Sequence, residues 1–191
     1  MVDSLGCRVL RYVSVTKCWS TKLSILAAIL LCSIIAVGQE VEITPGKNSV
    51  ALTITSSKSY HLLPTEEKQS TLTLMCALKG NKAGHLLLFS PGSEIGEDDP
   101  ETEPRNGQLT LKLKIGGTKQ VTSWIPYGSK ATFAYYGKTE PERLEFIQDL
   151  LTSPTVSVQF KPYLTGQLVT SDFDLSQLRD EVAKHPECGL K

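Results

Sequence analysis

The sequence predicts an α+β domain dominated by antiparallel β-sheet of meander or sandwich-like form, with two short helices in its C-terminal half and a signal peptide in front. Three observations predict it. Apolar and polar residues alternate in short runs separated by glycine, asparagine and proline, as in strands joined by turns. After Thr139 the apolar spacing twice becomes that of an amphipathic helix. An uncharged apolar segment, residues 23–37, precedes the whole pattern.

The apolar segment at residues 23–37 predicts export from the cytoplasm. It is fifteen residues long and directly follows Lys22. A helix of that length covers about 22 Å, whereas a membrane-spanning helix must cross roughly 30 Å of hydrocarbon. Small residues at Ala36 and Gly38 fit the positions that signal peptidase reads, so we expect cleavage before Gln39 and a periplasmic or secreted protein. The alternative is an uncleaved signal anchor, because the basic region in front is unusually long.

The chain of 191 residues is long enough for one domain behind an addressing segment. We divide it into a signal peptide at 1–38, an extended or β lead segment at 39–70 and an α+β domain at 71–191. The net charge is zero, but the first 22 residues are basic, and the remainder carries 16 basic and 19 acidic side chains. Such a body lacks the clustered lysine and arginine of a nucleic-acid surface, so we expect no nucleic-acid partner.

The predicted elements begin after an extended stretch at residues 39–48. Residues 50–54 alternate between apolar and small or polar side chains, as a half-buried strand does, and residues 56–69 are polar and turn-like. Residues 72–78 and 86–89 are apolar runs on either side of a short loop that contains glycine and asparagine. We predict a β-hairpin there.

A polar loop and three further strands follow. Residues 90–107 contain three prolines, three glycines and six acidic residues, which predicts a solvated loop. Its carboxylates lack the spacing of an EF-hand, so we expect no calcium site. Residues 109–115 show the clearest strand alternation in the chain, and residues 121–125 and 131–136 supply two more strands.

The C-terminal part alternates helices and strands. Residues 139–142 read Thr-Glu-Pro-Glu, which predicts a capping box at the start of a helix. The apolar stripe of this helix is expected at four positions: Leu144, Ile147, Leu150 and Leu151. Residues 156–160 and 167–170 are expected to pair as strands. Asp174 is expected to cap a second helix that ends at His185.

The cysteines predict a single disulfide. Three of the five lie in the segment expected to be removed: Cys7, Cys18 and Cys32. An even pair in an oxidising compartment usually forms a bridge, and the mature chain keeps only Cys76 and Cys188. Cys76 shares a strand face with neighbouring leucines, and Cys188 follows the last predicted helix. The alternative is a buried free thiol at Cys76 and a loose one at Cys188.

Five aromatic residues gather in the strands before the first helix: Trp124, Tyr127, Phe133, Tyr135 and Tyr136. Aromatic side chains at alternating strand positions are most often core and cross-strand packing. The alternative is an exposed carbohydrate-binding face. If these strands form a binding surface, four of the aromatic residues are its candidates: Trp124, Tyr127, Tyr135 and Tyr136.

The sequence contains no motif that indicates catalysis, a metal or a cofactor. It has no Gly-x-Ser-x-Gly elbow. Five carboxylates that could pair for glycoside hydrolysis lie near helix starts, where caps and helix dipoles already explain them: Glu140, Glu142, Glu145, Asp172 and Asp174. The three histidines do not have metal-ligand spacing: His61, His85 and His185. We therefore expect no catalytic, cofactor-binding or metal site.

From Thr71 onward, the order of elements resembles the C-terminal domain of the periplasmic VasI/TagO family associated with type VI secretion. The matching features are the apolar strand ending in Cys76, the strands up to Tyr136, the helix near 141–151, the Phe-Asp-Leu-x-x-Leu segment at 173–178, and Cys188. The resemblance implies the same α+β fold and the same terminal bridge. It also implies a link to a secretion apparatus.

Together these observations predict a non-enzymatic exported protein that binds a protein partner in the cell envelope, as an accessory to a secretion or envelope system. We expect contact with the membrane only through an uncleaved N-terminal segment. The alternatives are a hydrolase of envelope polymers and a carbohydrate-binding module.

Overall fold

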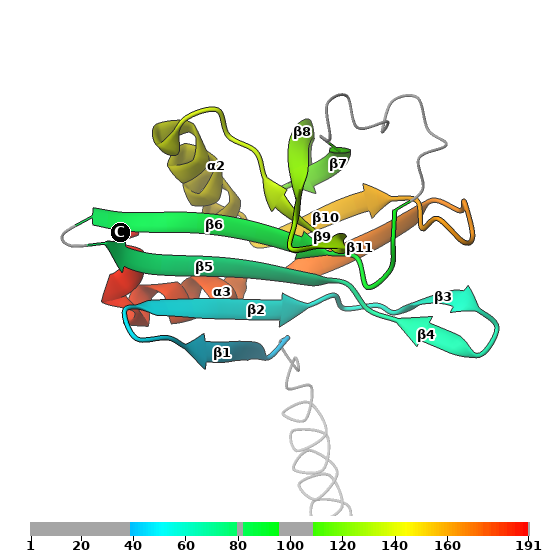
Figure 1. The fold of residues 1–191 in the computed structure, drawn as a ribbon, viewed down its shortest axis with the longest axis horizontal. Coiled ribbons are helices and arrows are strands. Elements are labelled where there is room, and N and C mark those ends of the chain that lie inside the picture. Colours follow the sequence, from blue (N-terminus) through cyan, green and yellow to red (C-terminus); the bar gives the residue numbers. More distant parts are fainter. Residues whose placement is uncertain (1–38, 80–81, 96–108, 191) are drawn as a thin grey trace, which may run out of the picture. The chain divides into compact units, whose positions relative to one another are not determined.

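Alternating apolar residues build one large antiparallel sheet (Figure 1). The computed structural model describes residues 39–79, 82–95 and 109–190. The signal peptide, its cleavage position and most of the loop predicted at 90–107 lie outside the described residues.

Nine strands form the large sheet, and every neighbouring pair is antiparallel. The strands are β1 (Val41–Pro45), β2 (Ser49–Thr55), β5 (Thr71–Lys79), β6 (Lys82–Ser90), β7 (Leu109–Ile115), β8 (Thr118–Tyr127), β9 (Ser129–Tyr135), β10 (Thr155–Phe160) and β11 (Val169–Asp174). Their order across the sheet is β1-β2-β5-β6-β9-β8-β7-β10-β11. This confirms the predicted α+β class. The predicted lead segment, 39–70, supplies β1 and β2 to the same sheet, and β2 pairs with β5 along its whole length.

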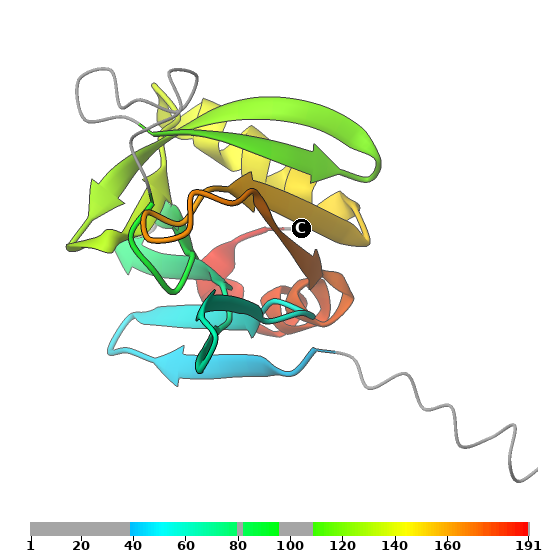
Figure 2. The same ribbon diagram turned by 90° about the vertical axis from the view of Figure 1, so that its right-hand side faces the viewer.

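The sheet is strongly curved, so that β11 returns towards β2 (Figure 2). Three contacts join β11 to the residues at the end of β2 and just before β5. The Ser57 N–H donates to the Asp172 carbonyl (2.8 Å), and the hydroxyls of Ser70 and Ser171 share a buried hydrogen bond of 2.8 Å. The side-chain amide of Gln39 donates to the Thr55 carbonyl and accepts from the Asp174 N–H. The curved sheet therefore encloses one core.

Aromatic rings fill the centre of this core. The ring of Phe89, on β6, makes edge contacts with Trp124 at 6.3 Å, Phe160 at 5.5 Å and Phe173 at 6.4 Å between centroids. These four residues come from β6, β8, β10 and β11, so a single ring cluster ties together strands far apart in the sheet order. Edge-to-face geometry is the arrangement that aromatic quadrupoles favour.

A small hairpin forms where the sequence predicts only polar turns. It comprises β3 (Tyr60–Leu63) and β4 (Glu66–Lys68). Its short alternation is too weak to identify from sequence, and tertiary contacts hold it. The Tyr60 hydroxyl donates to the Pro91 carbonyl (2.6 Å), and the Tyr60 ring meets Phe160 at 5.6 Å.

Helix α2 (Glu140–Thr152) begins with the predicted capping box. The Thr139 hydroxyl accepts from the Glu142 N–H, and the Glu142 carboxylate accepts from the Thr139 N–H. The apolar stripe is shifted from its prediction: Phe146 is buried, whereas Leu144 is only half-buried. The reason is a stacked contact between Phe146 and Tyr135, with centroids 4.0 Å apart.

Helix α3 (Ser176–Lys184) and a 3-10 turn, η1 (Pro186–Cys188), end the described chain. The predicted cap at Asp174 is wrong by one position. Asp174 still pairs with Thr155 as the last residue of β11, so its backbone is strand, and Leu175 is the N-cap. The Asp174 carboxylate nevertheless accepts hydrogen bonds from the N–H (2.9 Å) and the hydroxyl (2.6 Å) of Ser176.

Replacing Asp174 with asparagine is expected to lower the free energy of unfolding at pH 7 by about 1 kcal/mol. The hydroxyl and then the N–H of Ser176 hold the pKa of the Asp174 carboxyl below its usual value. A lowered folded-state pKa stabilises the protein above about pH 4, and this contribution is lost as the pH falls through the lower folded value. Urea unfolding at a series of pH values should show the difference shrinking towards about pH 2. Asp180→Asn, at an exposed position of α3, is the matched control. A difference independent of pH would contradict the prediction.

Candidate functional site

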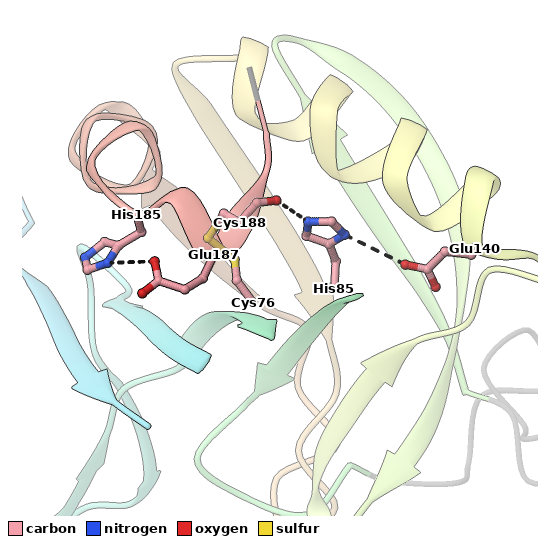
Figure 3. Close-up of a disulfide and its surroundings, with 6 residues drawn as sticks. All are labelled: Cys76, His85, Glu140, His185, Glu187 and Cys188. Atoms are coloured by element: carbon pink, nitrogen blue, oxygen red, sulfur yellow. Dashed lines mark hydrogen bonds and ion pairs between the residues drawn. A yellow bond between two sulfur atoms is a disulfide. The ribbon is translucent and has the colours of Figure 1, made fainter. Parts of the chain in front are cut away.

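The predicted disulfide is present. Cys76, on β5, is joined to Cys188, in η1, with Cα atoms 4.8 Å apart and 112 positions apart in sequence. Both cysteines are fully buried, and η1 packs against β5 (Figure 3). The free-thiol alternative is therefore wrong. The bridge fixes the C-terminal segment to the middle of the sheet.

A histidine lies beside this bridge. His85 is the cross-strand partner of Cys76, and its Nε2 lies 2.5 Å from the Cys188 carbonyl oxygen (Figure 3). A carbonyl can only accept, so Nε2 carries the hydrogen. The buried Nδ1 has no hydrogen-bond partner among the described residues and lies 3.8 Å from the Glu140 carboxylate. The buried His85 ring thus connects β6 to the C-terminal segment.

The carboxylates considered for hydrolysis are mostly engaged in structural contacts. The Arg143 side chain donates to Glu140 and is the main cause that lowers the pKa of that carboxyl. Glu142 completes the capping box of α2, and Asp172 accepts from the Ser157 hydroxyl at 2.6 Å. Together with Asp174, these side chains are accounted for by caps, hydrogen bonds and the ion pairs Arg143–Glu140 and Lys58–Asp172.

The histidines lie apart in the fold. His61 is on β3, His85 is on β6, and His185 follows α3. Over the described ranges, no three metal-ligating side chains come together. Those ranges also contain no helix with the length and apolar character needed to cross a bilayer.

The structure separates the four aromatic residues proposed as a surface. Trp124 has 0% of its side chain exposed, and its indole N–H donates to the Thr122 hydroxyl at 2.8 Å. It belongs to the core cluster and cannot contact a ligand, which corrects that part of the prediction. Tyr127 is exposed at the far end of β8, and Tyr135 is half-buried against Phe146. Tyr136 is exposed.

An open groove lies between β8, the end of β9 and α2, with a volume of about 420 Å³. Its lining includes both Tyr135 and Tyr136. Two exposed apolar side chains border it, Val121 at 69% exposure and Tyr136 at 40%. These two side chains supply the exposed apolar part of the groove.

Charge on one wall of the groove comes from α2. Glu142, Glu145 and Asp149 recur at helical spacing and line the groove against a single lysine, Lys138. The pKa of Tyr135, which also lines the groove, is raised. Burial of its hydroxyl is the larger cause, and the negative charge of the Glu142 carboxylate is the smaller one. The groove therefore combines an apolar rim with negative potential.

The sequence pattern does not predict this groove. The spacing of the three carboxylates along α2 is the available signal, but the predicted helix start accounts for Glu142 and Glu145. That explanation is right for Glu142, which caps the helix, but Glu145 and Asp149 make no cap. The opposite wall depends on where β8 lies relative to α2, which periodicity does not specify.

Comparison with known protein families, with curated protein sequences and with solved structures finds no match for this chain. The resemblance to the VasI/TagO family stays a prediction.

Proposed function

We propose that this protein is an exported, non-enzymatic accessory protein that binds a protein partner of the cell envelope through the groove between β8 and α2. One observation carries the proposal: exposed Val121 and Tyr136 border a hollow that is rimmed by carboxylates. Exposed apolar side chains next to polar and charged ones are the usual composition of a protein-binding surface.

Two further features support this reading. The buried Cys76–Cys188 bridge suits the oxidising compartment that an exported protein would enter. The hydrogen bonds of Glu140, Glu142, Asp172 and Asp174 account for those carboxylates without a catalytic role. Attachment to a type VI secretion apparatus is the finer form of the proposal, and it rests on the sequence resemblance alone.

Site-specific photo-crosslinking tests the proposal. A photoreactive phenylalanine analogue at Val121 should give a defined crosslinked product with one envelope protein, identified by mass spectrometry. The same group at Tyr163, which is 62% exposed and lies outside the groove, is the matched control. Equal products from both positions, or none from Val121 in cells that produce the protein, would contradict the proposal.

A glycan ligand is the second candidate, because Tyr136 lies beside carboxylates in the groove. Aromatic faces and hydrogen-bonding carboxylates suit sugar rings as well as peptides. Calorimetric titration with soluble peptidoglycan fragments should give saturable heat that Tyr136→Ala abolishes. Absence of heat would remove this candidate without affecting the first.

A further inference from the structure

One wall of the groove is an open strand edge. β9 pairs with β8 from Tyr127 back to Trp124, and the last hydrogen bond runs from the Tyr136 N–H to the Ser123 carbonyl at 2.8 Å. The chain then leaves the sheet at Gly137. A side chain there would meet Arg143 Cγ at 2.5 Å, so a glycine lets the chain pass close under α2. Val121, Thr122 and Ser123 of β8 consequently have β7 on one side and the groove on the other, and Lys119 continues the same edge away from the groove.

The direction of the free backbone groups follows from strand geometry. Backbone N–H and C=O groups of successive residues point to opposite edges of a strand, so those of every second residue share an edge. Because the Ser123 carbonyl points towards β9, the groups of Val121 and Lys119 point to that same edge. Within the described part of the chain these groups have no hydrogen-bonded partner. An edge of this kind is a template for another extended segment.

The charge of the groove indicates which kind of extended segment would bind there. Three carboxylates, Glu142, Glu145 and Asp149, outnumber the two basic side chains of the docking region, Lys138 in the lining and the exposed Lys119 on β8, so a cationic ligand is favoured. A second copy of this chain is disfavoured, because a symmetric contact would bring the same acidic wall against itself. Val121 and Tyr136 provide apolar surface for the side chains between the charges.

We propose that the groove binds an extended segment of a partner protein in which basic and apolar residues alternate, added as a further strand along β8 at Lys119–Ser123. Main-chain hydrogen bonds to Lys119 and Val121 hold the segment, and its basic side chains meet Glu145 and Asp149. This is recognition by strand addition, in which the backbone gives affinity and alternate side chains give specificity. The proposal rests on the proposed protein-binding function and names the chemistry of the partner.

A peptide titration on the isotopically labelled full chain tests the proposal. The probe is a capped nine-residue peptide of alternating lysine and valine. We expect saturable NMR shift changes centred on residues 119–123 and on α2. A glutamate–valine peptide should not bind, and a peptide N-methylated at alternate positions on its bonding edge should bind at least about ten-fold more weakly. Equal binding of the glutamate peptide or of the methylated peptide would overturn the proposal.

Variants of the protein test the two walls separately. Glu145→Gln with Asp149→Asn should weaken binding about five-fold or more at low salt, with a smaller difference at high salt. The matched control is Glu42→Gln with Asp180→Asn, which makes the same charge change at exposed positions on β1 and α3. An equal loss in both double variants would show that net charge, not the groove, attracts the peptide, and would overturn the proposal.

Val121→Pro removes one outward N–H without breaking a bond to β7, since proline is tolerated at strand edges. It should abolish binding, whereas Val121→Thr, which keeps the N–H, should retain most of it. If Val121→Pro fails to fold, the N-methylated peptide still decides the mode of binding.

If no peptide binds while crosslinking at Val121 succeeds, strand addition is wrong and the protein-binding function stands. If peptides bind at the groove and crosslinking finds no envelope partner, the proposed function fails instead.

Discussion

Breaking the Cys76–Cys188 disulfide is expected to lower the free energy of unfolding by about 4–5 kcal/mol. The bridge joins residues 112 positions apart, and chain-entropy arguments give the largest stabilisation to long loops. Release of the bridge would also free η1 from β5 and weaken the hydrogen bond between His85 and the Cys188 carbonyl. Both effects act in the same direction.

Urea unfolding with and without a reductant measures this effect. The oxidised protein should unfold at a clearly higher urea concentration than the reduced protein. Cys188→Ala is the matched control: it should resemble the reduced protein, and reductant should not change it further. Coincident curves for the oxidised and reduced protein would show that the bridge contributes little.

Phe89→Ala is expected to lower the free energy of unfolding by about 4–5 kcal/mol. The Phe89 ring is fully buried and touches the rings of Trp124, Phe160 and Phe173, so its removal leaves a cavity and breaks three edge contacts. Phe89→Leu should cost about 1–2 kcal/mol, because a branched side chain fills much of the space. This milder variant keeps the measurement possible if the alanine variant unfolds.

Thermal and urea unfolding, followed by the fluorescence of Trp124, report this change directly, because the indole is a neighbour of the altered site. Tyr163→Ala, at an exposed position, should shift stability by less than about 0.5 kcal/mol. A Phe89→Ala effect as small as that of the Tyr163 control would mean that the ring cluster does not hold the sheet together.

Local patterns were sufficient for several elements. The alternation at residues 109–115 and 156–160 predicts strands because every second side chain must face the core, and both strands form. The capping box at 139–142 is a contact between residues three apart, so it depends little on the rest of the fold. The disulfide follows from counting the cysteines outside the predicted signal peptide, which leaves only Cys76 and Cys188.

Other features required the folded chain. The hairpin at residues 60–68 forms because Tyr60 reaches Pro91 and Phe160, which are distant in sequence. The position of Trp124 in the alternating pattern fits a surface residue as well as a core residue. Only its contacts with Phe89 and Thr122 show that it is buried. Asp174 has the composition of a cap, but pairing with Thr155 keeps its backbone in the strand.

The sequence alone determined a β-rich body with two C-terminal helices and one bridged cysteine pair within that body, because each depends on residues near in the chain or on composition. The tertiary structure decided the strand order and therefore the groove. The groove exists because β9 stops pairing with β8 at Ser123 and α2 lies beside the edge that is left. Neither fact is local: an open edge is defined by the strands around it, and periodicity along one strand cannot reveal it.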